Sequence, residues 1–142
     1  MFKSRFLIVA LLFFIMACSA KEPQNTPQQF WHEFRAAVMA SDFVALQNLS
    51  KLPLALHGAV DGVPVQEVNG EQFETVMKDV LNQPLASYEG NQLITYTQRE
   101  LVIKTAALAG QMVKEDGGFR VGDLVFESLD GRWQLVRAYL SE

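Results

Sequence analysis

Histidine and cysteine, which often carry acid–base, nucleophilic or metal chemistry near neutral pH, are few in this sequence. It has two histidines, His32 and His57, and one cysteine, Cys18. A histidine beside a pocket can act as a general base because its pKa lies near neutral pH, so His57 is the candidate catalytic residue. Its nearest acidic neighbour along the chain is Asp61, and the simpler interpretation is a surface histidine at a strand end. Two histidines and one cysteine are too few for a structural zinc site, and we expect neither a metal nor a cofactor.

The single cysteine follows an apolar run near the start of the chain. Lys3 and Arg5 precede this run, which extends from Phe6 to Met16. A membrane-spanning helix needs roughly 20 apolar residues, so the run is too short for a permanent anchor and is typical of a signal peptide. The residues Ile15-Met16-Ala17-Cys18 resemble the lipobox of bacterial lipoproteins, with methionine a mild departure at the tolerant position.

The lipobox resemblance implies a lipid anchor on Cys18 and cleavage after Ala17. Several acyl chains, palmitate among them, anchor a protein stably, whereas one chain binds a membrane reversibly. Ser19, a residue other than Asp after the cysteine, implies delivery to the periplasmic face of the outer membrane if the host is Gram-negative. The alternative is an ordinary secreted protein that is cleaved near Ala17 or Ala20.

The chain therefore divides into three parts. Residues 1–17 are the expected signal peptide, residues 18–26 the lipidated cysteine with a polar tether, and residues 27–142 a single domain. Removal of residues 1–17 takes away Lys3 and Arg5, which changes the net charge from −4 to −6. Such an acidic balance argues against nucleic acid as a partner. The expected membrane attachment is through the lipid alone.

Arg137 is the charged residue with the most informative position. It lies in the segment Phe119 to Leu140, which reads as two long strands joined by a turn at Asp130-Gly131. Counting outward from that turn places Arg137 opposite Leu124, on the bulkier and more apolar face that should meet the core. The other large residues expected on this face are Phe126, Trp133, Leu135 and Tyr139, and Gly122 is expected opposite Tyr139.

An arginine on an apolar face needs water, a carboxylate or a ligand for its charge. If the sheet curves over a pocket, Arg137 could bind an anionic group of a ligand in a bidentate manner. Phe126, Trp133 and Tyr139 would then supply the apolar walls of that ligand pocket. The alternative is that Arg137 reaches water at the strand end or pairs with a carboxylate such as Asp123 or Glu100.

The opposite face of the same hairpin suggests a different role. Its expected apolar residues form a strip between polar ones, and they are Val121, Val125, Val136 and Ala138. Such a strip on an outer sheet face could join two copies of the chain. A structural homodimer is therefore a third hypothesis, beside a binding module and an enzyme.

Periodicity and capping patterns predict the remaining elements. Helices are expected over 27–40 after a capping box at Thr26 and Gln29, over 42–49 after Ser41, over 71–81 after Asn69, and from Gln98 to about 105. Strands are expected over 54–58, 65–68, 92–97 and 112–114, with 82–90 as a loop around Pro84. This order predicts an α+β domain in which helices cover one face of an antiparallel sheet.

Three short segments also resemble small exported bacterial proteins of the nuclear transport factor 2-like superfamily. They are Phe30-Trp31-His32-Glu33-Phe34-Arg35, Ser50-Lys51-Leu52-Pro53, and the final segment with Val121-Gly122-Asp123, Asp130-Gly131-Arg132-Trp133 and Arg137-Ala138-Tyr139. The resemblance implies a curved antiparallel sheet packed against the N-terminal helices, often around an apolar pocket. That superfamily contains binding modules as well as isomerases and dehydratases, so the fold does not give the function.

Taken together, the sequence favours a lipid-anchored cell-envelope protein that acts as a non-catalytic binding or accessory module. Its expected partner is a small apolar or anionic ligand, or another envelope protein. The alternative is a pocket enzyme of the isomerase or dehydratase kind, with His57 as base and Tyr88, Tyr96 or Tyr139 as hydrogen-bond donor.

Overall fold

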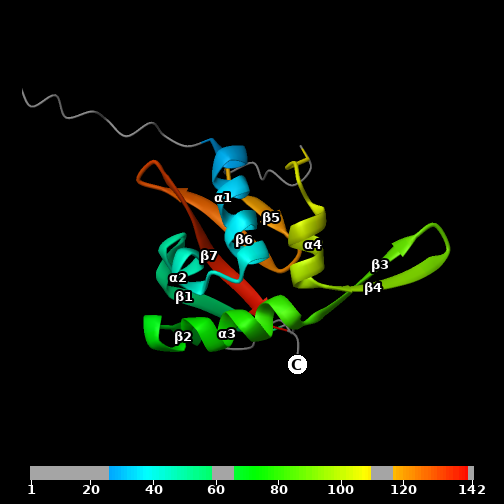
Figure 1. Cartoon of the computed structure of the whole chain (residues 1–142), viewed down its shortest axis with the longest axis horizontal. Coiled ribbons are helices and arrows are strands. Elements are labelled where there is room, and N and C mark those ends of the chain that lie inside the picture. The colour runs from blue at the N-terminus through cyan, green and yellow to red at the C-terminus, as the bar shows by residue number, and fades with distance from the viewer. Residues whose placement is uncertain (1–25, 59–65, 110–116, 141–142) are drawn as a thin grey trace, which may run out of the picture.

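A computed structural model describes residues 26–58, 66–109 and 117–140 of the chain. The expected signal peptide, the Cys18 lipidation site and the predicted strand at 112–114 lie outside these residues. Figure 1 shows the described part as helices lying over one face of a sheet, with a two-stranded hairpin extending away from the body.

The first two helices begin where side chains can cap them. Helix α1 (Pro27–Ala40) has the predicted capping box, in which Thr26 and Gln29 satisfy each other's backbone N–H groups. Helix α2 (Phe43–Asn48) is capped by Asp42, whose carboxylate accepts from the Ala45 N–H. The prediction of Ser41 as this cap was wrong, because Ser41 instead ends α1 in a left-handed conformation, with φ 53°.

The middle of the chain contains the elements that the sequence predicted there and one further strand that it did not predict. Strand β1 (Ser50–Gly58), strand β2 (Gln66–Val68), helix α3 (Gly70–Asn82), strand β4 (Gln92–Thr97) and helix α4 (Gln98–Lys104) agree with the predictions apart from their exact ends. The predicted loop at 82–90 is instead strand β3 (Pro84–Glu89), which pairs antiparallel with β4. Pro84 is tolerated because it is the first residue of a strand at a sheet edge.

The main sheet has five strands in the order β2-β1-β7-β6-β5. Strands β5 (Phe119–Val121), β6 (Leu124–Leu129) and β7 (Arg132–Leu140) come from the final segment of the chain. Strand β1 pairs parallel with β7, and the other pairings in this sheet are antiparallel. The α+β class and a mainly antiparallel, curved sheet packed against helices are therefore confirmed.

The final segment contains two tight turns where the sequence predicted one. The turn at Asp130-Gly131 is confirmed, since both residues have positive φ, at 52° and 79°. The second turn is Gly122-Asp123, which reverses the chain so that Val121 pairs with Leu124. Gly122 has φ 58°, and a glycine at the first of two turn residues is a known hairpin signal. The expectation that Gly122 lies opposite Tyr139 within one long strand was therefore wrong.

A bulge in β7 changes which residues share a face. The predicted register holds from Leu129–Arg132 to Phe126–Leu135, and then shifts, so that Val125 pairs with Arg137 and Leu124 with Ala138. As a result, Ala138 joins the core and Arg137 turns to the opposite side, which corrects the predicted face of both. Val121 is also in the core, so the expected outer strip of four small apolar residues does not exist.

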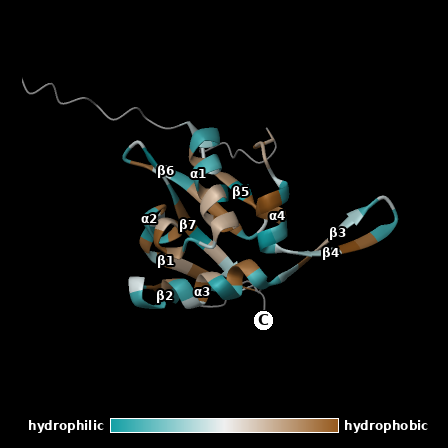
Figure 2. Ribbon diagram, viewed as in Figure 1, coloured by the Kyte–Doolittle hydropathy of each residue, from teal (hydrophilic) through white to brown (hydrophobic). Residues whose placement is uncertain are grey.

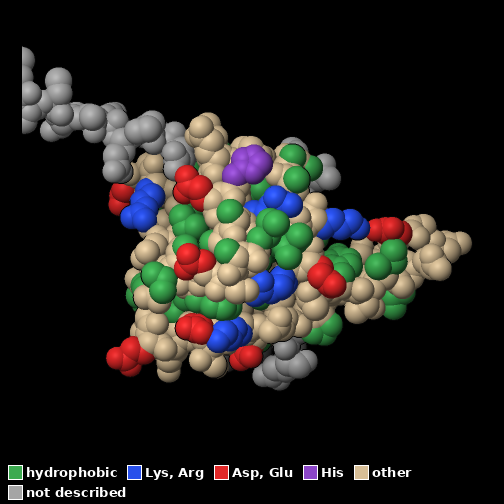
Figure 3. All heavy atoms as spheres, viewed as in Figure 1, with side chains coloured by type: hydrophobic (Ala, Val, Ile, Leu, Met, Phe, Trp, Pro, Cys, Tyr) green, Lys and Arg blue, Asp and Glu red, His purple; other side chains and the backbone are tan. Residues whose placement is uncertain are grey.

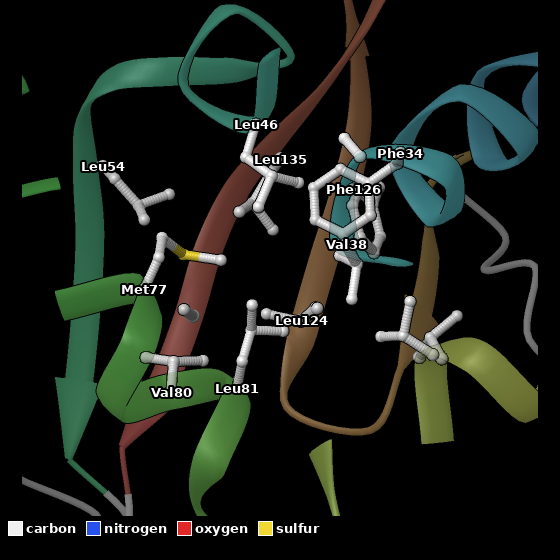
Figure 4. Close-up of a cluster of buried hydrophobic side chains, with 14 of the residues drawn as sticks. Phe34, Val38, Leu46, Leu54, Met77, Val80, Leu81, Leu124, Phe126 and Leu135 are labelled. Carbon is white, nitrogen blue, oxygen red and sulfur yellow. The ribbon is translucent and has the colours of Figure 1, made fainter. Parts of the chain in front are cut away.

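The core lies between the helices and the inner face of the sheet. Phe34 and Val38 of α1, Leu81 of α3 and Phe126 of β6 converge there (Figure 4). The rings of Phe126 and Phe34 are 4.9 Å apart at nearly right angles, which is a favourable arrangement for aromatic pairs. Figure 2 shows hydrophobic stretches on both the helices and the strands. These side chains pack against one another between the helices and the sheet.

Candidate functional site

The outer face of the sheet, opposite the helices, brings together four polar or aromatic side chains. We define the outer-face cluster as His57, Arg120, Arg137 and Tyr139. Each of them alternates along its strand with residues that are buried in the core, such as Leu56 beside His57. Strand pairing brings them close, because His57 is the register partner of Tyr139 and Val125 lies between Arg120 and Arg137.

Arg137 has very few polar partners in this cluster. Its Nη1 is 3.5 Å from the Tyr139 hydroxyl oxygen, which is at the limit of a hydrogen bond. Its Nε is buried, and within the described ranges no hydrogen-bond acceptor reaches it. A buried donor without an acceptor costs about 1–3 kcal/mol, and more when the group is charged. The Nε–H of Arg137 is therefore a buried donor without an acceptor in the described part of the chain.

Arg120 differs from Arg137 because its guanidinium is already engaged. Its Nε donates to the Gly122 carbonyl at 2.7 Å, and its Nη2 lies 3.3 Å from an Asp123 carboxylate oxygen. The same guanidinium lies over the Tyr139 ring, 4.8 Å from the ring centre, in a cation–π arrangement. Arg120 thus positions the Tyr139 ring, whereas Arg137 has no carboxylate partner among the described residues.

The backbone of Tyr139 is held by hydrogen bonds to both its N–H and its carbonyl. Its N–H donates to the Asp123 carbonyl at 2.9 Å. Its carbonyl accepts from the Gln83 side chain at 2.8 Å, and the same Gln83 amide reaches Asp123 at 2.9 Å. Buried Gln98 holds the neighbouring turn, because it donates to the Val121 carbonyl and accepts from the Asp123 N–H. These bonds link the Gly122-Asp123 turn to the end of β7, so the Tyr139 backbone is held in place.

His57 lies beside Tyr139, with the two ring centres 5.3 Å apart. In the part of the chain that the structure describes, no carboxylate forms an ion pair with the His57 ring. His32 is separate from this cluster, since it lies on the exposed side of α1 near Gln28. The predicted base thus has a tyrosine neighbour and no acidic orienting group there, and Asp61 lies outside the described residues.

The four residues expected to line one pocket lie on two different faces. Arg137 and Tyr139 are on the outer face, while Phe126 is fully buried on the inner face and stacks on Phe119 with ring centres 4.6 Å apart. Trp133 is also on the inner side, and the centres of its ring and the Phe119 ring are 5.4 Å apart. It lines a shallow cavity of about 390 Å³. Phe126 and Trp133 therefore cannot form walls around Arg137, whose neighbour on the outer face is Tyr139.

Sequence reasoning missed Arg120 as a member of the cluster. A signal for it existed, because the Gly122-Asp123 turn puts Arg120 on a short strand between Phe119 and Val121, both buried. Alternation then places Arg120 on the outer face. The pairing of β1 with β7, which adds His57, has no comparable local signal, since the two strands are far apart in the sequence.

A second hollow lies between the β3–β4 hairpin and α4. This cleft has a volume of about 370 Å³, and its walls include Ile94, Tyr96 and Leu101. Its charged residues are Glu89, Glu100 and Lys104, and Lys104 lies 3.7 Å from Glu89. With two carboxylates and one ammonium, the cleft is less suited to an anion than the outer-face cluster.

Three observations complete the description of the site. No group of three or more His, Cys, Asp or Glu side chains within residues 26–58, 66–109 and 117–140 is arranged to hold a metal ion. None of the helices in these ranges is long and apolar enough to cross a bilayer. Comparisons with protein-family models, with curated proteins and with solved structures found no match to this chain.

Proposed function

We propose that this chain is a lipid-anchored cell-envelope protein whose domain is a non-catalytic binding module for an anionic ligand. The observation that carries the proposal is the Arg137 guanidinium, whose buried Nε has no acceptor among the described residues. A carboxylate or phosphate group would accept from Arg137 and lie beside the Tyr139 hydroxyl and the His57 ring. The neighbouring Arg120 adds positive charge to the same face of an otherwise acidic protein.

The anchoring part of the proposal depends on residues 1–26. The charged start, the apolar run and the residues Ile15 to Cys18 support lipidation of the Cys18 thiol. Labelling of cells with tritiated palmitate should mark the wild-type protein, and Cys18→Ser should abolish the label. A labelled Cys18→Ser variant would contradict the proposal, as would a wild-type protein that stays unlabelled.

We also propose that the domain is of the nuclear transport factor 2-like type. The helices on one face of a curved, mostly antiparallel sheet support this assignment. Members with an interior pocket would bind ligands between sheet and helices, and here that space holds Phe34, Phe126 and their neighbours. The outer face is therefore the better place for a ligand in this chain.

Native mass spectrometry tests the binding proposal. The full-length protein, extracted from its membranes in a mild detergent, should carry a small anionic molecule. Arg137→Gln should lose that molecule, because the shorter neutral amide has neither the charge nor the two parallel donors of the guanidinium. Arg132→Gln is the matched control, since Arg132 lies on the same strand and its guanidinium donates to the Asn48 carbonyl, away from the cluster. Retention of the molecule by Arg137→Gln, or a wild-type protein without any adduct, would contradict the proposal.

One observation favours the pocket-enzyme alternative, namely the adjacent rings of His57 and Tyr139. On that account His57 would move a proton and the Tyr139 hydroxyl would donate a hydrogen bond to the substrate. His57→Ala would then stop chemical conversion of the co-purified molecule while that molecule still binds. On the binding account the molecule is recovered unchanged from the wild-type protein.

A further inference from the structure

The β3–β4 hairpin, hereafter the arm, is the least supported part of the described fold. Its strands are joined by the two residues Gly90 and Asn91, and they form a separate two-stranded sheet. Figure 1 shows the arm extending away from the body. A two-stranded hairpin on its own is only marginally stable in water, so the arm would gain from additional pairing.

The two faces of the arm have different surroundings. Ile94 and Tyr96 point to the side of α4 and line the cleft described above. On the other face, Tyr88 and Leu93 are register partners, and they are 72% and 57% exposed. In the space-filling view the tip of the arm is tan, and hydrophobic and acidic side chains lie between the tip and the body (Figure 3). The arm thus presents large apolar side chains to solvent at a distance from the body.

The two edges of the arm also differ. Strand β3 begins with Pro84, which has no N–H, and ends with the charged Glu89, and both features discourage pairing along an edge. Strand β4 has the sequence Gln-Leu-Ile-Thr-Tyr-Thr, with no charge, no proline and no glycine. Figure 2 shows its hydrophobic stretch. Among the described strands, only β3 pairs with β4, which leaves the other edge of β4 open.

We propose that this open edge pairs with β4 of a second copy of the same chain, antiparallel and about a two-fold axis at Thr95. The sequence of β4 is complementary to itself in that register. Thr95 faces Thr95 of the partner, and Ile94 faces Tyr96 of the partner, twice by symmetry. Threonine pairs and aromatic–β-branched pairs are favourable cross-strand neighbours, and no like charges meet. The two arms then form a four-stranded sheet.

The shape of the molecule suits this arrangement. In an antiparallel pair the tip of one arm lies beside the base of the other, so the two bodies lie at opposite ends of the new sheet. A closed two-fold contact of this kind stops at two copies. Because Ile94 and Tyr96 line the cleft beside α4, the partner's Tyr96 would come to lie at the edge of that cleft. The dimer is independent of the outer-face cluster.

A charge placed on the axis tests the proposal. In Thr95→Lys two lysines would face each other, which should weaken the dimer about tenfold or more. Ala86→Lys is the matched control, because Ala86 is the register partner of Thr95 on β3 and lies on the same exposed face, away from the open edge. Light scattering on the full-length protein in detergent should give a two-copy mass for the wild type and for Ala86→Lys, and a one-copy mass for Thr95→Lys.

A thiol at the axis gives a second readout that does not depend on the lysine. Thr95→Cys should form a disulfide-linked two-copy species under mild oxidation, whereas Ala86→Cys should not, and the wild type controls for Cys18. The proposal is overturned if the wild type has a one-copy mass at every concentration, or if both cysteine variants cross-link equally. It is also overturned if Thr95→Cys links to a different protein in cells, which would assign the edge to another partner.

Discussion

The hairpin of β6 and β7, hereafter the body hairpin, and the arm of β3 and β4 are built in the same way but have different surroundings. Each consists of two alternating strands joined by two residues. The body hairpin pairs with β1 and β5 along its edges. One of its faces packs in the core under the helices, and the other carries polar side chains. The arm has one face over a cleft, one face in solvent and an open edge. The local sequence pattern is therefore enough to predict a hairpin. The neighbouring elements determine whether each of its faces and edges is buried, paired or exposed.

The largest expected effect comes from removing the central ring of the body hairpin. Phe126 is fully buried among Phe34, Phe119 and Trp31, so Phe126→Ala should lower the free energy of unfolding by about 3–5 kcal/mol. The matched change in the arm, Tyr88→Ala, should cost no more than about 0.5 kcal/mol, because Tyr88 is exposed. Urea unfolding of both variants checks this. Equal losses would mean that the arm belongs to the cooperative core.

The second prediction compares glycines at the turns of the two regions. An alanine Cβ at Gly122 would lie 2.8 Å from Leu101 Cδ2 and closer still to the Gln98 amide, and the backbone there has φ 58°. Gly122→Ala should therefore cost about 2–4 kcal/mol. Gly90, at the arm tip, has φ 63° and no atom within 4 Å of such a Cβ, so Gly90→Ala should cost only about 1 kcal/mol. Thermal unfolding measures both, and a reversed order would refute the packing described around Gln98.

The smallest expected effect concerns the outer face of the body hairpin. Because Nε of Arg137 is buried without an acceptor in the described part of the chain, Arg137→Leu should leave the free energy of unfolding unchanged within about 0.5 kcal/mol, or raise it. Arg120→Leu should lower it slightly, by about 0.5–1 kcal/mol, because Arg120 bonds to Gly122 and Asp123. A loss of more than about 2 kcal/mol for Arg137→Leu would assign Arg137 to stability instead of binding.

The sequence predicted the elements that local chemistry specifies. A capping box at Thr26 and a cap at Thr97 predicted the starts of α1 and α4, and Asp130-Gly131 predicted the body hairpin. The sequence did not predict β3, because Pro84 indicated a loop. A proline is also acceptable at the start of an edge strand. This miss lies at a position where a single residue, Pro84, permits two structures.

The site was predicted in part, for a similar reason. Arg137 and Tyr139 were identified from the sequence, but they were expected on the same face as Phe126 and Trp133. The bulge opposite Val125 moved Arg137 to the other face. The same one-residue shift places Ala138 beside Leu56 and Leu124 of the neighbouring strands. Strand neighbours that are distant in the sequence are not visible in a local pattern, so His57 and Tyr139 could not be paired beforehand.

The central claim is that the Arg137 guanidinium is the anion-binding group of the outer face. The most direct test is nuclear magnetic resonance of the arginine Nε–H groups during titration of the protein with inorganic phosphate and then with citrate. We expect a saturable shift of the Arg137 Nε–H with at least one of these anions, while the Arg132 Nε–H stays unchanged. An Arg137 signal that does not move with either anion, or that moves no more than that of Arg132, would show that Arg137 does not bind anions.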